Sequence, residues 1–383
     1  MFLKKHWTLS NSKQILAVFT IWRVALFLVL LFAINFIPLA GKNFFGGGLG
    51  NYTAKPYLFA WANFDGEHYL SIAQFGYKDL EQAFFPIYPA IIHLLSFPWQ
   101  HSFTSVTLIG LLISNISFFL ALYFLFKLLR FDYSVRISYL VLLIILAFPT
   151  AFYFASVYNE ALFFLLAILT FYFARKKRWF WVGIFGMVAA ATRVFGIILF
   201  LALLIEAWQG REKIGSYFWI LLIPLGLIAY MIYQWVSVAD PLAFYHLQTI
   251  VGPQHESGII LLPQIYFRYT KILLTSELSN PIYPIIVLEF AVGLSFFILP
   301  IIGFLKKVRL SYLAFALIGF LLPSVQGSFS SAPRYVLILF PSFLVLGIIV
   351  DSLPKLFKIG YFIMSGILLI FFSMLFFRGY WVA

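Results

Sequence analysis

Residues 15–37 read ILAVFTIWRVALFLVLLFAINFI, an apolar run of 23 residues with one charged side chain, Arg23. About 20 apolar residues in helical form cross the hydrocarbon core of a bilayer. Lys4, Lys5 and Lys13 precede the run. A signal peptide has the same order of charge and apolarity, but its apolar region is shorter and a small-residue cleavage motif follows it, which is missing here. We therefore interpret the run as a retained transmembrane helix.

The composition extends this interpretation to the whole chain. Of 383 residues, 63% are hydrophobic and 10% are charged, and the mean hydropathy is +0.99. Soluble domains contain about 45–50% apolar and about 25% charged residues, so a soluble enzyme, a disordered protein and a coiled coil are excluded. We predict an all-α polytopic membrane protein in which residues 1–383 form a single transmembrane domain. The chain has no cysteine, which excludes disulfides, thiol chemistry and Cys-ligated metals.

The apolar runs predict about eleven spans. The run at 179–208 is interrupted by Thr192-Arg193, and a charge is costly in hydrocarbon. We therefore expect two short helices that meet at the outer membrane surface. Besides the first run, the apolar stretches lie near residues 104–126, 137–153, 158–174, 179–208, 216–236, 283–304, 311–325, 334–350 and 359–377.

The basic residues predict the orientation, because cytoplasmic loops are enriched in Lys and Arg. If residues 179–208 cross the membrane twice, the basic clusters all fall on one side of the membrane. That side is the cytoplasm, and it contains the N-terminus. Two long loops, 38–103 and 237–282, and most carboxylates then face outward, and we expect the active face there. The formal charge of +13 fits anionic lipid head groups and gives no reason to expect nucleic acid. The clusters are Lys4/Lys5/Lys13, Lys127/Arg130/Arg136, Arg175–Arg178, Arg211/Lys213, Lys306/Lys307/Arg309 and Lys355/Lys358.

Three stretches of the outer loops have the spacing of amphipathic helices. They are residues 59–77, 83–97 and 263–275. A helix with one apolar face lies along the membrane surface, and we expect this placement for 59–77 and 263–275. Residues 83–97 either lie there too or dip into the outer leaflet.

The first of these stretches carries the clearest chemistry. Residues 61–77 read WANFDGEHYLSIAQFGY. On a helix, Asp65 shares a face with His68 and Tyr69, whereas Glu67 points elsewhere, so the two acids do not form a catalytic pair. Two interpretations follow from the residues alone. Asp65 is a general base at the water–lipid boundary, or it belongs to the solvated polar face of a surface helix.

Five blocks of the sequence together resemble one known family. They are FDGEHY at 64–69, FFPIYP at 84–89, YNEALF at 158–163, ATRVFG at 191–196 and SAPRY at 331–335. In this order, over most of the chain, they resemble the second mannosyltransferase of GPI-anchor assembly and its bacterial relatives, which belong to the GT-C superfamily of polytopic glycosyltransferases. One position departs from the pattern: Asn159 stands where relatives often have Ser or Thr.

The resemblance implies a GT-C type bundle and an inverting glycosyltransferase. Such an enzyme moves a sugar, typically mannose, from a polyprenyl-phosphate donor to a hydroxyl acceptor outside the cytoplasm, and its loop aspartate, here Asp65, is the general base. The sequence itself leaves the acceptor open between a glycolipid, a cell-wall polymer and a protein, and we expect a glycolipid or another cell-envelope component. Trp381-Val382-Ala383 form no ER-retention tail and the loops are short, so we expect a plasma membrane. The substrate-binding candidates are His68, Tyr69, Tyr88, Asn159, Glu160, Arg193, Arg334 and Tyr335.

Several of these candidates also have a purely structural interpretation. Arg193 would hold the donor phosphate bidentately, or it would pair with Glu160 or Glu289. Arg334 opens the run 334–350, where a helix N-terminus favours an anion, or it reaches for lipid head groups. Glu160 would serve the site, or it would stabilise the dipole of its own helix. His68 would orient the acceptor or bind phosphate, or it is a surface histidine.

The remaining charged residues favour catalysis without a metal cofactor. The acids of the first loop, Asp65, Glu67, Asp79 and Glu81, contain no DxD pair, and Mg²⁺ needs converging oxygen ligands. In the second loop His246, His255, Asp240 and Glu256 match no zinc motif. We therefore predict no cofactor and metal-independent catalysis.

One alternative function remains: a flippase or transporter of lipid-linked sugar. It would need charges and broken helices near the midplane, often in repeated halves. The sequence has Arg23 in mid-span and no convincing repeat. We expect Arg23 to face the bundle with a structural partner, either an acid or backbone carbonyls.

Overall fold

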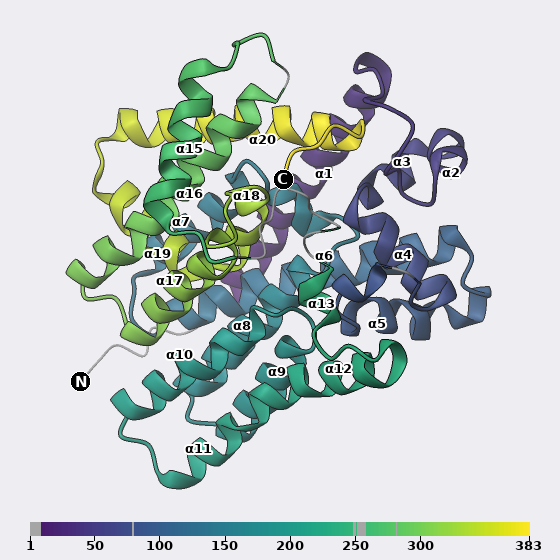
Figure 1. Cartoon of the computed structure of the whole chain (residues 1–383). Coiled ribbons are helices and arrows are strands. Elements are labelled where there is room, and N and C mark those ends of the chain that lie inside the picture. The colour runs from purple at the N-terminus through teal and green to yellow at the C-terminus, as the bar shows by residue number, and fades with distance from the viewer. Residues whose placement is uncertain (1–8, 79, 248–249, 251–257, 281) are drawn as a thin grey trace.

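The computed structural model describes residues 9–78, 80–247, 250, 258–280 and 282–383 (Figure 1). Every regular element within these ranges is helical, which confirms the predicted all-α class. Lys4, Lys5, Asp79, His255 and Glu256, named above, lie outside the described residues.

By length and composition, five of the described helices are able to cross a membrane. They are α1 (Leu9–Phe36), α6 (Phe103–Leu129), the pair α11 and α12 (Ile214–Ile220 and Leu222–Val238, continuous as Ile214–Val238), α16 (Tyr283–Leu305) and α20 (Lys355–Phe377). A bent pair near residue 339 raises the number to six, and shorter apolar helices account for the other runs. The chain is therefore a multi-pass membrane protein, and the total of eleven spans stays a prediction.

Helix α8 (Glu160–Arg175) lies at the centre of the bundle (Figure 1). On one side is the group from α9 (Trp179–Ala190) to α12, and on the other is the group from α16 to α19 (Phe340–Ser352). Nearly all its side chains are buried, and α6, α9 and α10 pack against it. A helix that is apolar on all sides is stable only when other helices cover it. Its first residue, Glu160, is therefore carried into the interior. Further elements, besides those described in the next paragraphs, are α2 (Leu49–Ala54), η2 (Glu81–Ala83), α5 (Ile87–Ser96), η3 (Phe97–Trp99), α7 (Val135–Ala147), η4 (Ala151–Ala155), α13 (Ala243–His246), α15 (Leu262–Thr275) and α17 (Leu310–Ser324).

The expected break at Thr192-Arg193 is present. Helix α9 (Trp179–Ala190) ends before it and α10 (Gly196–Gln209) starts after it. The two helices meet so closely that a Cβ on Gly196 would lie 2.3 Å from the backbone nitrogen of Ala190. Glycine at 196 therefore lets the chain turn back while Arg193 stays in the turn.

The run at 334–350 does not form one continuous helix, and its crossing of the membrane stays a prediction. Helix α18 (Ala332–Tyr335) and η5 (Val336–Ile338) are bent by 88° from α19 (Phe340–Ser352). Pro341 lies in the first turn of α19, where a missing N–H is harmless, but it could not continue the preceding helix. Arg334 therefore lies in a four-residue helix that has no sizeable dipole, and the argument from a helix N-terminus does not apply to it.

The expected helix over 59–77 is also shorter than predicted. It divides into α3 (Pro56–Phe59), η1 (Ala60–Ala62) and α4 (Asp65–Phe75). The break falls at Asn63, whose buried amide donates to the carbonyl of Phe376 at 2.9 Å and accepts from the backbone N–H of Gly46 at 3.3 Å. At Asn63 the backbone is extended, with φ −66° and ψ 156°, so the helix is interrupted there. The other two loop helices, α5 and α15, lie within or beside their predicted ranges.

The basic clusters gather at one end of the bundle. Arg175, at the end of α8, pairs with Asp132, which follows α6, and Arg309 pairs with Glu206 at 2.7 Å. The 16 residues of α8 extend about 24 Å. Glu160, at the other end of this helix, is therefore separated from the basic clusters by most of a hydrocarbon layer.

Candidate functional site

A cavity of about 520 Å³ opens at the end of the bundle that carries Glu160. Its walls come from the start of α4, the turn between α9 and α10, α13, the end of α17, α18 and the segment after α20. Seven of the nine predicted site residues line it: Asp65, His68, Tyr69, Asn159, Arg193, Arg334 and Tyr335.

Four charged side chains form a chain of alternating sign at this cavity. Arg334 Nη1 donates to Asp65 Oδ2 at 2.6 Å. Arg334 Nε lies 3.6 Å from Glu160 Oε1, and Arg193 Nη1 lies 2.5 Å from the same oxygen. Two cations and two anions from four separate segments thus neutralise one another. Buried charges persist only when they are paired in this way.

The fold puts both carboxylates at helix starts. Asp65 is the first residue of α4 and Glu160 is the first residue of α8. The N-terminal end of a helix carries partial positive charge, which favours an anion by about 0.3–1 kcal/mol. Glu160 is thus placed to stabilise the dipole of its own helix. The same carboxylate also pairs with Arg193, which lines the cavity.

Asn159 fixes the turn that carries Arg193. Its Oδ1 accepts from Arg193 Nη1 at 2.6 Å, and its Nδ2 donates to the carbonyl of Thr192 at 2.9 Å. A carboxamide offers an acceptor and a donor on separate atoms. Asn159 thus forms hydrogen bonds with both the side chain of Arg193 and the backbone of the turn.

The structure decides between the two structural partners considered for Arg193. It pairs with Glu160, whereas Glu289 accepts a hydrogen bond from the hydroxyl of Tyr269 at 2.7 Å. Arg334 is 5% exposed and is engaged with Asp65, so it does not reach for lipid head groups.

His68 faces the cavity one turn after Asp65. Its ring stacks on Phe84, with centroids 4.7 Å apart, and Nδ1 lies 3.8 Å from Glu81 Oε1. Burial lowers the pKa of His68, but the carboxylates of Glu81, Asp65 and Glu67 outweigh it, and the net pKa is raised. The imidazolium therefore persists to a higher pH than in a free histidine, which adds positive charge beside the Asp65 carboxylate.

Tyr69 and Tyr88 pack against each other, with centroids 5.2 Å apart. Tyr69 is on the cavity wall, and burial raises the pKa of its hydroxyl well above the usual value. Tyr88 is fully buried behind it and donates to the carbonyl of Gly110 at 3.0 Å. Tyr88 has no surface on the cavity, so it supports the wall and does not contact a substrate there.

A family model described as mannosyltransferase (PIG-V) matches residues 12–210, just over half of the chain. The chain belongs to the PIG-V mannosyltransferase family. The resemblance inferred from the motifs is thereby confirmed. The matched region contains Asp65, Asn159, Glu160 and Arg193, whereas Arg334 lies beyond it. No curated protein sequence matches this PIG-V family chain.

Several solved structures are similar to this PIG-V family chain. ArnT from Cupriavidus metallidurans bound to undecaprenyl phosphate has 14% sequence identity and a TM-score of 0.49, over 91% of this chain and 62% of that one. The oligosaccharyltransferase from Archaeoglobus fulgidus in its apo form has 13% identity and a TM-score of 0.49, over 99% of this chain and 57% of that one. The chain thus spans about three-fifths of the length of these proteins.

Sequence reasoning missed several residues at the site of this PIG-V family member. Arg334 lies 5.7 Å from the ring centroids of both Tyr153 and Tyr158, which add cation–π contacts. Tyr158 is the first residue of the block 158–163, so its place in the motif was a usable signal. Trp381 and Phe44 also line the cavity, but nothing in their local sequence indicates it.

Among the described residues, Arg23 has neither of its expected partners. Its Nε donates to Asn115 Oδ1 at 2.8 Å, and its guanidinium lies 3.8 Å from the ring centroid of Trp61. A side-chain amide and an aromatic ring thus replace the acid or the carbonyl cluster that we expected. This arrangement is structural, because Arg23 is not among the residues that line the cavity.

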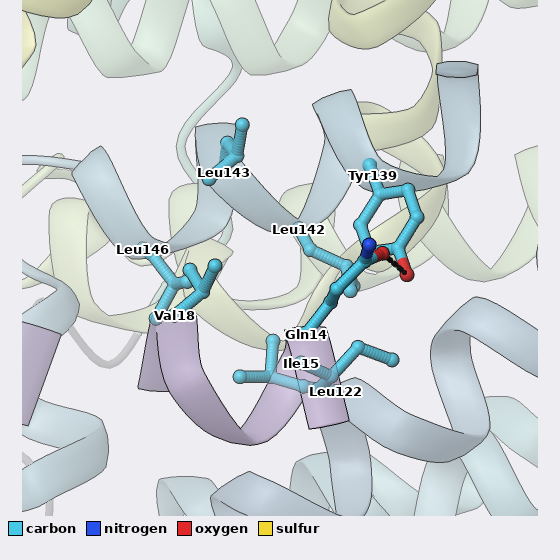
Figure 2. A pocket seen from close by; sticks show the side chains of 8 residues that line it. All are labelled: Gln14, Ile15, Val18, Leu122, Tyr139, Leu142, Leu143 and Leu146. Atoms are coloured by element: carbon cyan, nitrogen blue, oxygen red, sulfur yellow. Dashed lines mark hydrogen bonds between the residues drawn. The ribbon is translucent and has the colours of Figure 1, made fainter. Parts of the chain in front are cut away.

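A second, smaller hollow of about 250 Å³ lies between α1, α6 and α7 (Figure 2). Gln14 and Tyr139 meet there through a hydrogen bond of 2.7 Å, and the other lining residues are aliphatic. It contains no charged side chain, so it offers no group for glycosyl transfer. As for metals, no three His, Asp or Glu side chains converge in the described part of the chain, and metal-independent catalysis stays a prediction.

Proposed function

We propose that the chain is an inverting glycosyltransferase that moves a sugar, mannose in the first instance, from a polyprenyl-phosphate donor to a hydroxyl acceptor on the extracytoplasmic face. The observation that supports it is the carboxylate of Asp65 on a cavity wall, 2.6 Å from the guanidinium of Arg334. A base and a phosphate-binding cation are thus adjacent, as the reaction requires.

The proposed step assigns a role to each charge. The acceptor oxygen forms a bond to the anomeric carbon while the bond from that carbon to the phosphate oxygen breaks. The acceptor proton goes to Asp65, and the configuration at the anomeric carbon inverts. The departing polyprenyl phosphate gains negative charge, which Arg334 and Arg193 stabilise; a guanidinium suits this task because its fork matches phosphate oxygens.

The cavity has a wall that suits the polyprenyl tail. Val194 and Phe195 follow Arg193, and Leu322 and Pro323 lie at the end of the apolar helix α17. The centroid of the Phe195 ring is 5.5 Å from the guanidinium of Arg193. An apolar chain on this wall keeps its phosphate at the two arginines.

The orientation and the acceptor are part of the proposal. The basic clusters lie about 24 Å from Glu160 along α8, and basic residues favour the cytoplasmic side, so we place the cavity outside, in a plasma membrane. The acceptor is a glycolipid or another cell-envelope component.

The test is transfer by the purified chain in liposomes. We expect mannose from polyprenyl-phosphate mannose to appear on an envelope glycolipid. Mass spectrometry of the glycolipid measures the transfer. Asp65→Asn reduces the rate by about 10²–10⁴ because the base is lost. Asp240→Asn is the matched control, since Asp240 bonds with His246 outside the cavity, and it transfers normally. Leaflet exchange of the donor without transfer would support a flippase instead.

A further inference from the structure

The hollow of about 250 Å³ between α1, α6 and α7 shares no lining residue with the cavity around Asp65 (Figure 2). Its floor is aliphatic and recessed: Ile15 is 2% exposed, Leu142 3% and Leu146 5%. Helices α1 and α6 are candidate spans, so the hollow faces hydrocarbon. A hollow with such walls takes up apolar molecules rather than water.

One end of the hollow is polar. The hydroxyl of Tyr139 donates to Gln14 Oε1 at 2.7 Å. Figure 2 shows these two side chains together on one side of the hollow, whereas Val18 and Leu146 lie on the other. Within the described part of the chain the amide N–H groups of Gln14 form no hydrogen bond, so they remain as donors. The hollow therefore suits a molecule that has an apolar chain and a head group with acceptor oxygens.

The length of the hollow fits one lipid chain. Tyr139 and Leu146 both line it from α7, and the helix between them is about 10 Å long. One leaflet of the hydrocarbon core is about 15 Å thick. An acyl chain whose head group lies at the polar end therefore follows the hollow over most of a leaflet. A helix of another protein is about 10–12 Å across with its side chains, so it is too wide for a hollow of this volume.

Basic side chains surround the polar end. Lys13 is exposed on α1, one residue before the amide that lines the hollow, and Arg136 lies one turn before Tyr139. Arg136 Nε is 2.7 Å from Asp351 Oδ1, and Lys358 Nζ is 3.8 Å from the same oxygen. One carboxylate cannot neutralise these cations, so positive charge remains in excess at this end. Basic pockets between membrane helices bind anionic lipid head groups.

We propose that the hollow binds one acyl chain of an anionic phospholipid, whose phosphate is held by Lys13 and Arg136. The chain moves from bulk lipid to an equally apolar wall, so its burial favours no particular lipid. The phosphate forms charge-assisted hydrogen bonds with the cations. A zwitterionic head group gains less, because the same cations repel its positive group. The head group therefore decides which lipid is bound. The site lies at the basic end of the bundle and does not depend on the proposed reaction.

The test is native mass spectrometry of the purified full chain in detergent, with dioleoyl phosphatidylglycerol and dioleoyl phosphatidylcholine as probes. The two lipids have the same chains and differ in the charge of the head group. We expect one phosphatidylglycerol to bind about tenfold more tightly than phosphatidylcholine. Leu143→Trp fills the hollow and should weaken the binding of both lipids about tenfold. Lys13→Gln/Arg136→Gln should remove the preference between the lipids and keep the weak binding that they share.

Two variants outside the hollow are the matched controls. Lys306→Gln/Lys307→Gln removes two exposed cations that follow α16 at the same end of the bundle. Leu221→Trp adds a tryptophan at an exposed position between α11 and α12. Neither control should change the binding of either lipid more than about twofold.

Each of three results would overturn the proposal. The first is equal binding of the two lipids by the wild-type chain. The second is unchanged binding of phosphatidylglycerol by Leu143→Trp. The third is the same loss of preference in Lys306→Gln/Lys307→Gln as in Lys13→Gln/Arg136→Gln. Thermal unfolding shows whether each variant is folded, and Val18→Phe fills the hollow from α1 if Leu143→Trp is not.

Discussion

Arg334 donates to the carboxylate of Asp65 at 2.6 Å, although 269 residues separate them in the sequence. The pair joins the proposed base to the proposed phosphate ligand in one contact. In the proposed reaction the donor phosphate and Asp65 therefore share the guanidinium of Arg334.

This pair predicts a coupled loss of activity and stability. In Arg334→Met, Asp65 and Glu160 lose a buried cation, and removing one member of a buried pair destabilises a protein by about 3–5 kcal/mol. Transfer should fall at least about 10²-fold because the departing phosphate loses its cation. Thermal unfolding and the liposome assay measure both effects.

The double variant Asp65→Asn/Arg334→Met sharpens the comparison. It should recover part of the lost stability, because no unpaired charge remains between the two positions, and it should recover none of the activity. Arg136→Met is the control, because Arg136 is exposed and pairs with Asp351 at the other end of the bundle. The free energy of unfolding of Arg136→Met should therefore fall by less than about 1 kcal/mol. Near-normal transfer by Arg334→Met would remove Arg334 from the mechanism.

His68 predicts a pH dependence of stability. Its folded-state pKa is raised above the ordinary histidine value, so the protonated form favours the folded state. The contribution is fully present below about pH 6.5, the unfolded value, and it is lost as the pH rises through the raised folded value. The pKa of Glu81 is lowered, mainly through His68 against the effect of burial, so Glu81 stays ionised throughout this window.

Thermal unfolding of the wild type and of His68→Gln at a series of pH values measures this effect. The wild type should lose stability relative to His68→Gln as the pH rises above neutrality. His246→Gln is the control, because His246 bonds with Asp240 outside the cavity. If the unfolding temperature depended on pH in the same way for the wild type and His68→Gln, the pair of His68 and Glu81 would contribute nothing to stability.

The orientation is testable because the chain has no cysteine of its own. Leu278, 80% exposed, lies between α15 and α16, and Ile214, 87% exposed, starts α11 beside Lys213. A membrane-impermeant maleimide should label Leu278→Cys in intact cells and Ile214→Cys only after permeabilisation. The reverse pattern would place the cavity in the cytoplasm and end the proposal of an outward-facing enzyme.

Local patterns in the sequence were enough for the long apolar helices and for the proposal of Asp65 as the base. The length and apolarity of α1, α6, α16 and α20 are properties of each segment alone, because lipid accepts such a helix whatever its neighbours are. The break at Thr192-Arg193 follows in the same way from the cost of one charge in hydrocarbon. Asp65 stood out because its motif is contiguous.

Only the tertiary structure decided how these parts meet. The break at Asn63 depends on a carbonyl of α20, 313 residues away, and the partner of Arg334 is set by α4 and α8 together. Trp381 reaches the cavity because α20 ends beside Asn63, and no local pattern records that. The length and apolarity of a segment decide whether it forms a membrane helix. The pairing of charges and rings instead depends on contacts between segments that are adjacent only after the bundle has packed.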